Sequence, residues 1–205
     1  MANYPAPSPR YIGPPAHTST GSNKPIHRIV IHATVSPCVK GGAVSTAHYF
    51  QNPAAGGSAH YTTDPGEVIQ CAYDSVICWH APPNDNSLGI EMCDMPALSM
   101  KRWRRAAPRH GASRNPMRWI EPNHRAMLRR TINLTAELCL AYNVPAVFLS
   151  PRMLRAGRHG ITTHNNVSKA FHQSSHWDPG VWPRRLFMRE VRKEIARIKA
   201  THKEK

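Results

Sequence analysis

The stretch ITTHNNVSKAFHQSSHWDPG, residues 161–180, places His164 and Asp178 in one polar segment that ends in Pro-Gly. Imidazole nitrogen and carboxylate oxygen are ligands that zinc accepts, and a catalytic zinc commonly has three protein ligands and one open position. The third ligand that we expect is His32, near the end of the apolar run RIVIHA. A strand ending in His32 and facing a loop with the other two residues would form such a site. By spacing alone, surface or capped-loop residues are the more common explanation, because the chain contains 13 histidines.

Four further motifs occur in order along the chain. They are IVIHAT at residues 29–34, SAHYTTDPGEVIQ at 58–70, WHA at 79–81 and NSLGIEM at 86–92. Together with residues 161–180, this order resembles the zinc-dependent N-acetylmuramoyl-L-alanine amidases, the superfamily that also contains the peptidoglycan recognition proteins. The resemblance covers residues 25–186, and within the family the chain looks like the amidase module of a phage endolysin.

The resemblance implies an α/β fold, with a central mixed β-sheet of about five or six strands flanked by helices. It also implies one zinc ion, held by His32, His164 and Asp178. Glu91 in the Gly-Ile-Glu motif would take a proton from the attacking water and deliver it to the departing amine. A carboxylate in a mostly apolar strand is costly unless it is paired, bound to metal or catalytic. On pattern alone, a glutamate on a solvated strand face is the alternative.

His176 is the main departure from the family pattern. The family usually has a lysine two residues before the metal-binding aspartate, where a cation stabilises the oxyanion, and this chain has His176 there. Because an imidazolium loses its charge across the physiological pH range, we expect activity to fall at alkaline pH. Two alternatives stay open: His80 supplies this cation, or His176 is the third zinc ligand.

By resemblance the substrate is bacterial peptidoglycan, and the bond that is cut joins the lactyl group of N-acetylmuramic acid to L-alanine of the stem peptide. The family places the histidine of the WHA motif beside the substrate, and we expect His80 in a turn at the rim of the site. We expect further substrate contacts from Thr34 and Asn84. Some members use a catalytic tyrosine just before the histidine at position 60, but this chain has Ala59 there.

The charge of the chain favours an anionic partner. The 205 residues suit a single domain and include 27 Lys and Arg against 12 acidic residues, a net charge of +15. Residues 101–118 alone carry seven basic residues and no acidic one. No motif of a nucleic-acid-binding domain is present, so we expect anionic wall polymers and no stable nucleic-acid partner.

The sequence also gives expectations for the cellular compartment and the oligomeric state of the protein. No apolar run approaches the length of a transmembrane segment, and the first residues lack the charged and apolar regions of a signal peptide. We therefore expect synthesis in the host cytoplasm and release to the wall through a membrane pore made by a separate protein. The five cysteines have no metal-binding spacing, which indicates free, mostly buried thiols in a reducing compartment. We expect a monomer.

Two other functions remain open for this sequence. A peptidoglycan-binding module of the same fold would hold muropeptides without cutting them. The presence of His176 in place of the usual lysine is consistent with this alternative. A basic nucleic-acid-binding protein would bind DNA with a steep dependence on salt.

The chain divides into a flexible, proline-rich arm at residues 1–25, a zinc amidase domain at 26–200 and a tail at 201–205. The arm has too few aliphatic residues to offset its ordering entropy. Hydrophobic periodicity and turn residues predict strands at 28–34, 59–63, 67–72 and 87–92, a further short strand at 147–149, and helices at 43–51, 123–142 and 183–199. Residues 152–160 are expected to form a basic loop that leads to the metal-binding stretch.

Overall fold

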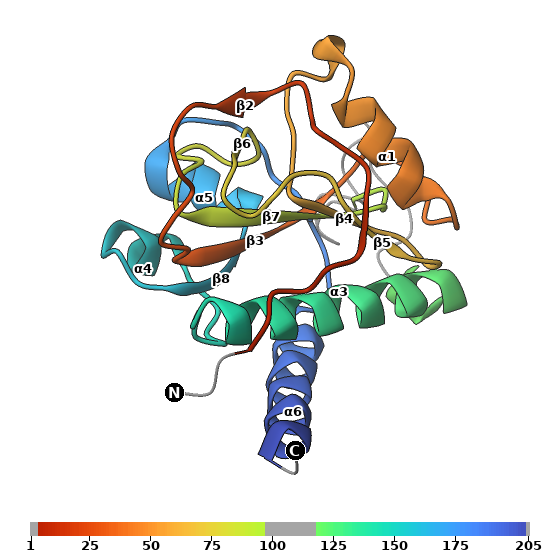
Figure 1. Ribbon diagram of the computed structural model, residues 1–205, viewed down its shortest axis with the longest axis vertical. Helices are drawn as coiled ribbons and strands as arrows, with labels where there is room; N and C mark the ends of the chain where they lie inside the picture. Colours follow the sequence, from red (N-terminus) through yellow and green to blue (C-terminus); the bar gives the residue numbers. More distant parts are fainter. Residues whose placement is uncertain (1–3, 97–117, 204–205) are drawn as a thin grey trace, which may run out of the picture.

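A mixed sheet of six strands lies at the centre of the protein (Figure 1). The computed structural model describes residues 4–96 and 118–203. In the order β1-β5-β4-β7-β3-β8, the strands are Arg10–Tyr11, Val68–Gln70, Tyr61–Thr63, Ser87–Met92, Arg28–Ala33 and Gly160–Thr163. Strands β4 and β5 form an antiparallel hairpin, and the other neighbours in the sheet are parallel. The mixed sheet predicted from the sequence is therefore confirmed.

Helices cover both faces of this sheet. Within the described residues, they are α1 (Gly42–Phe50), α3 (Pro122–Ala141), α4 (Pro151–Arg155), α5 (His164–Phe171) and α6 (Arg184–Lys203), with short 3₁₀ turns at Pro53–Ala55 and Arg118–Ile120. The long helices α3 and α6 pack against each other and cross below the sheet in Figure 1. The three helices predicted from periodicity are therefore present as α1, α3 and α6.

Side chains of β3 alternate between two cores. Ile29 and Ile31 pack in the larger core, which contains residues of α1, α3 and α6. Val30 packs in a smaller core with residues of α4 and α5. Because successive side chains of a strand point to opposite faces, His32 lies on the same face as Val30, toward α5.

Three local predictions differ from the structure. Residues 152–160 were expected to be a loop, but Pro151–Arg155 forms α4, because Ser150 accepts a hydrogen bond from the Met153 amide and Pro151 suits the first helical position. The expected strand at 147–149 is reduced to a single bridge between Phe148 and Ile161. The tail at 201–205 begins inside α6, which contains neither glycine nor proline and continues to Lys203.

The segment before residue 26 packs on the fold, which differs from the flexible arm that its composition predicts. It contributes β1 and pairs β2 (Thr18–Ser19) with β6 (Ile77–Cys78) in a separate antiparallel ladder. Ile12 is buried in the larger core, and the side-chain amide of Asn23 is completely buried. The few apolar and polar residues that pack inward were missed because the average composition conceals them.

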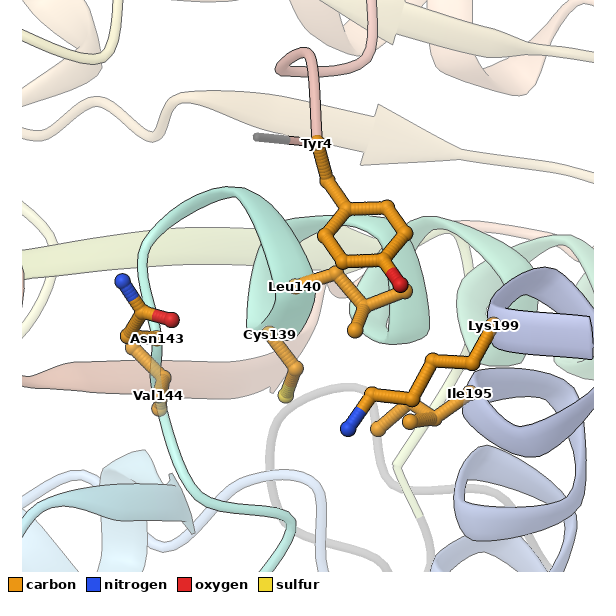
Figure 2. Close-up of a pocket in the computed structure, with 7 residues that line it drawn as sticks. All are labelled: Tyr4, Cys139, Leu140, Asn143, Val144, Ile195 and Lys199. Atoms are coloured by element: carbon orange, nitrogen blue, oxygen red, sulfur yellow. The ribbon is translucent and has the colours of Figure 1, made fainter. Parts of the chain in front are cut away.

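Near its start, at Tyr4, this segment covers a cavity of about 450 Å³ that lies between α3 and α6 (Figure 2). Tyr4, Cys139 and Lys199 are among the residues that line it. Burial raises the pKa of the Cys139 thiol to about 12, so this cysteine is not a nucleophile at neutral pH. All five cysteines are free and four are buried, as predicted.

No helix in the described ranges is long and apolar enough to cross a membrane. The basic stretch at 101–118 lies outside the described residues except for Arg118.

Candidate active site

His32 and Glu91 are brought together by the register of two parallel strands. They are paired residues of β3 and β7, and His32 Nδ1 lies 3.8 Å from Glu91 Oε1. Leu88, Ile90 and Met92 of β7 pack in the larger core, so the alternation of the strand directs Glu91 to the other face, where His32 lies. Both side chains sit near the carboxyl ends of their strands, where open α/β sheets commonly build their sites.

His164 directly follows β8, the strand that neighbours β3 on its other side. Strand β8 is parallel to β3 and ends at Thr163, whose side chain accepts a hydrogen bond from the Asn166 amide and caps α5. His164 is therefore the first residue of a helix, not part of a loop as expected from the sequence. Thr163 before a polar helical turn is the capping signal that could have indicated this helix.

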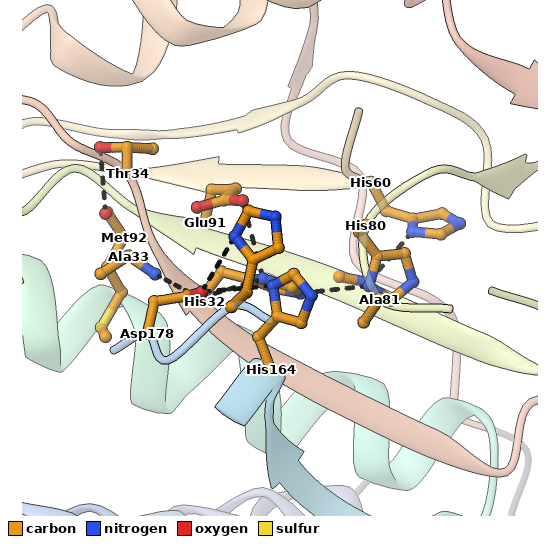
Figure 3. Close-up of polar contacts among 12 residues, drawn as sticks. His32, Ala33, Thr34, His60, His80, Ala81, Glu91, Met92, His164 and Asp178 are labelled. Carbon is orange, nitrogen blue, oxygen red and sulfur yellow. Dashed lines mark hydrogen bonds and ion pairs between the residues drawn. The ribbon is translucent and has the colours of Figure 1, made fainter. Parts of the chain in front are cut away.

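Asp178 completes the group from the segment after α5. Its Oδ1 lies 3.2 Å from His164 Nδ1, and its Oδ2 lies 3.3 Å from His32 Nδ1 (Figure 3). The Ala33 amide donates to Oδ2 at 3.4 Å, and the Asn165 amide donates to the Asp178 carbonyl at 3.1 Å. One possible ligand atom from each of His32, His164 and Asp178 lies within 4.8 Å of the others.

The protonation states of this group suit a divalent cation. Burial lowers the pKa of His32 to about 4, so its imidazole is neutral at pH 7 and has a free lone pair. Burial acts to raise the pKa of Asp178, but its close contacts with His164 and His32 outweigh it and hold the pKa below its usual range. Two imidazoles and one carboxylate are a donor set that zinc accepts, and the residues present therefore fit this metal.

Glu91 borders the group as a buried carboxyl with unused hydrogen-bonding capacity. Its Oε2 is buried and has no hydrogen-bond partner among the described residues. Burial, and next the negative charge of Asp178, raise the pKa of Glu91 well above its ordinary value. A buried carboxyl with a raised pKa beside a ligand group is a frequent property of proton-transfer residues.

A sequence-family model for N-acetylmuramoyl-L-alanine amidases matches residues 22–181. The chain belongs to the N-acetylmuramoyl-L-alanine amidase family. The expected enzyme class, an amidase that acts on peptidoglycan, is confirmed at the level of this family. No curated protein sequence matches the chain.

Solved structures with the amidase fold are similar over most of the chain. The hydrolase AmiA of Staphylococcus aureus, in complex with its ligand, has a TM-score of 0.62 at 16% identity, covering 93% of this chain and 84% of AmiA. A mutant endolysin from Bacillus subtilis has a TM-score of 0.52 at 18% identity, covering 89% of this chain and 97% of the endolysin. At these identities the likeness establishes the fold alone.

His176 lies on the open side of the amidase site. Its side chain is 66% exposed, its ring stacks on His164 with centroids 4.4 Å apart, and its Nδ1 is 3.9 Å from Asp178 Oδ1. Partial burial and the neighbouring His164 lower the pKa of His176. Its imidazole is therefore mainly neutral at pH 7 and offers a hydrogen-bond donor, whereas the sequence led us to expect a cation.

His80 does not lie at the rim, where the sequence placed it. Its side chain is buried behind His32, with Nδ1 3.1 Å from His32 Nε2 and Nε2 3.0 Å from Ser87 Oγ. The physical reason is that the turn after β6 folds the WHA motif inward, where Gly89 of β7 has no side chain and leaves space for the His80 ring. Asn84 is partly buried beside it, and its Oδ1 accepts hydrogen bonds from the His80 and Ala81 amides.

Thr34 is the third residue that we expected to contact the substrate. It follows β3, is partly exposed, and its hydroxyl contacts Ser36 Oγ at 2.5 Å. Its contact with substrate stays a prediction. Sequence reasoning missed Ser174, whose Oγ lies 3.2 Å from His164 Nε2, and Ser87, because short polar residues give no periodic signal of their contacts.

Proposed function

We propose that this protein is a zinc-dependent amidase that hydrolyses the bond between N-acetylmuramic acid and L-alanine in peptidoglycan, and that it acts in phage-induced lysis of the host. The observation that supports zinc dependence is the convergence of His32, His164 and Asp178 within 4.8 Å, beside the buried Glu91. Membership of the family supports the substrate and the bond.

His32, His164 and Asp178 would hold the zinc. When bound, zinc supplies Lewis acidity, which polarises a carbonyl oxygen and makes water more acidic. The three residues come from β3, the start of α5 and the segment after it, so two of them are fixed directly by the parallel sheet.

Glu91 is the residue that moves the proton. Its raised pKa makes the carboxylate a stronger base than an exposed glutamate, and its Oε2 is free to accept a proton from water. The protonated carboxyl can then donate to the departing amide nitrogen, which must leave as an amine. General acid–base catalysis by such a group typically contributes ~10²–10⁴ in rate.

His176 has the position for stabilising the oxyanion. It is the exposed residue that stacks on His164, so a substrate carbonyl placed at the ligand group would lie within reach of its ring. As a hydrogen-bond donor it would replace the lysine that the family usually has.

The lytic role is supported by charge and by fold. The net charge of +15 favours association with the anionic polymers of a bacterial wall. Similar folds include an endolysin amidase, LysCS from Clostridium intestinale, with a TM-score of 0.50 at 13% identity and coverage of 93% and 99%. We propose that the enzyme reaches the wall from the host cytoplasm through a separate pore-forming protein.

The decisive experiment compares metal content and release of dye-labelled peptidoglycan fragments for three proteins. Wild type should contain one zinc and lose activity with a chelator. Glu91→Gln should retain zinc and lose ~10²–10⁴ in kcat. His164→Ala should lose both zinc and activity.

His48→Ala is the matched control, because His48 is an exposed histidine of α1 outside the site. It should behave like the wild type. Binding of peptidoglycan by a zinc-loaded wild type without any cleavage would contradict the proposal and favour the non-catalytic binding module.

A further inference from the structure

A chain of buried hydrogen bonds runs from His32 away from the ligand group. His32 Nε2 contacts His80 Nδ1 at 3.1 Å, His80 Nε2 contacts Ser87 Oγ at 3.0 Å, and Ser87 Oγ lies 2.7 Å from the Asn84 carbonyl. The two imidazoles and the serine are all buried. Figure 3 shows His80 on the side of His32 opposite Glu91 and Asp178.

The end of this chain sets the direction of every bond in it. A carbonyl oxygen can only accept, so the single hydroxyl proton of Ser87 is donated to Asn84. Ser87 Oγ must then accept from His80 Nε2, and in a neutral imidazole this leaves His80 Nδ1 without a proton. His80 Nδ1 therefore accepts from His32 Nε2, and the free lone pair of a neutral His32 is on Nδ1, the atom that faces Asp178.

The position of the His80 ring is fixed on several sides. The ring lies over Gly89 of β7, where an added Cβ would come within 2.7 Å of His80 Cγ. The His80 amide donates to Asn84 Oδ1 at 3.0 Å, which holds the turn that carries the ring. The Asn23 side chain accepts from the Ser87 amide at 3.1 Å and donates to the Ser87 carbonyl at 2.7 Å, so the N-terminal segment holds the serine in place.

We propose that His80 is a positioning residue that, with Ser87 and the Asn84 carbonyl, fixes the tautomer and orientation of His32. The proposal deepens the proposed function and rests on His32 being a zinc ligand through Nδ1. It gives His80 no contact with substrate, in contrast to the role that the family resemblance implied. Outer partners of metal-bound histidines typically contribute ~10–100-fold to metal affinity.

The first test measures zinc affinity by competition with a chromophoric chelator. His80→Leu keeps the volume but removes the acceptor, and should weaken zinc binding by ~10–100-fold. His80→Asn places Oδ1 where Nδ1 was and should restore most of the affinity. If His80→Leu binds zinc as tightly as the wild type, or if His80→Asn binds no better than His80→Leu, the proposal is wrong.

His60→Leu is the matched control. His60 is also a buried imidazole with both nitrogens bonded, to the Gly89 amide and the Val76 carbonyl, but it makes no hydrogen bond to His32 or His80. It should reduce stability and leave zinc affinity unchanged. An equal loss of zinc affinity in His60→Leu would overturn the proposal, because general loosening of the fold would then explain both results.

The second test does not depend on a variant that folds. Nitrogen-detected NMR of zinc-loaded wild type should show a proton on Nε2 of His80 and none on its Nδ1. A proton on Nδ1 of His80 would overturn the proposal. Absence of zinc from purified wild type would instead refute the proposed function itself, and the metal content of the wild type alone reveals that case.

Discussion

The two histidines of the ligand group are supported differently at their outer nitrogens. Behind His32, the outer nitrogen meets His80 in a buried chain that ends on a backbone carbonyl. Behind His164, the outer nitrogen contacts Ser174 Oγ at 3.2 Å, and Ser174 in turn contacts Ser168 Oγ at 2.6 Å. The chain behind His32 includes Ser87 of strand β7 in the central sheet, whereas Ser174 follows the end of α5 and is partly exposed.

This difference divides the site into an inner wall and an outer wall. We call the inner wall β3 and β7 with His80, and the outer wall residues 172–183. The inner wall has parallel register and is mostly buried, so the sheet itself fixes the positions of His32 and Glu91. The outer wall carries the exposed rings of His176 and Trp177, where a polymeric substrate can approach.

One carbonyl of the outer wall, that of Val181, accepts two hydrogen bonds from the turn at Arg118–Ile120. Arg118 Nη1 donates to the Val181 carbonyl at 3.2 Å, and Trp119 Nε1 donates to the same oxygen at 2.9 Å. Arg118 is held in turn by Asp94, whose Oδ1 accepts from Arg118 Nε at 2.8 Å and from His124 Nε2 at 3.1 Å. Both charged side chains of this pair are buried.

The largest effect that we expect follows from breaking this attachment. Asp94→Asn leaves the Arg118 charge buried without a counterion, which typically costs ~3–5 kcal/mol of unfolding free energy. Denaturant unfolding should show this loss, and hydrogen exchange should rise more in the outer wall than in β3. Glu67→Gln is the control, since it removes only the partly exposed ion pair with Arg10 and should leave the midpoint unchanged.

The lowered pKa of Asp94 also predicts how the stability of the protein depends on pH. Burial acts to raise its pKa, but hydrogen bonds from Arg118 and His124 outweigh it and lower the pKa below 3.8. Since the folded value lies below the unfolded one, its contribution is complete above the unfolded value and is lost as pH falls through the folded value. Asp94→Asn should lack this acid-dependent component. An identical acid dependence in the variant and the wild type would contradict the assignment.

The next effect concerns the chemistry on the outer wall. His176→Ala should lower kcat by ~10²–10³, the usual cost of losing one oxyanion donor, and should retain zinc. His176→Lys, which restores the residue that the family usually has, should recover activity. Loss of zinc from His176→Ala would show instead that the ring supports His164, on which it stacks.

Much of the fold could be predicted from periodicity because its elements have strong local signals. The apolar β-branched run of β3 and the spaced apolar residues of α3 gave correct elements. The prediction of a flexible N-terminal arm was wrong. Asn23 is buried through hydrogen bonds with Asp74 and Ser87, which lie 51 and 64 positions away in the sequence, and no local pattern encodes such contacts.

The candidate site was predictable only in part. The three candidate metal-binding residues and Glu91 were predicted from motif order, and the structure places their side chains together. The environment of His80 was not predictable, since the same WHA motif is consistent with an exposed turn or a buried one. Its burial depends on Gly89 leaving space beside the strand, a relation between two motifs that becomes visible only when the sheet is assembled.

The smallest effect that we expect decides whether the two walls differ as described. Ser174→Ala removes the partner of His164 Nε2, but this position is partly exposed, so water can replace the hydroxyl. Its zinc affinity should therefore fall by less than ~10-fold, at or below the lower end of the range for outer partners, while His80→Leu loses more. The exposed neighbour Ser175 provides the matched control as Ser175→Ala, measured in the same chelator competition. If Ser174→Ala and His80→Leu weakened zinc binding equally, the outer wall would support its histidine as firmly as the inner wall does. The proposed difference between the two walls would then be wrong.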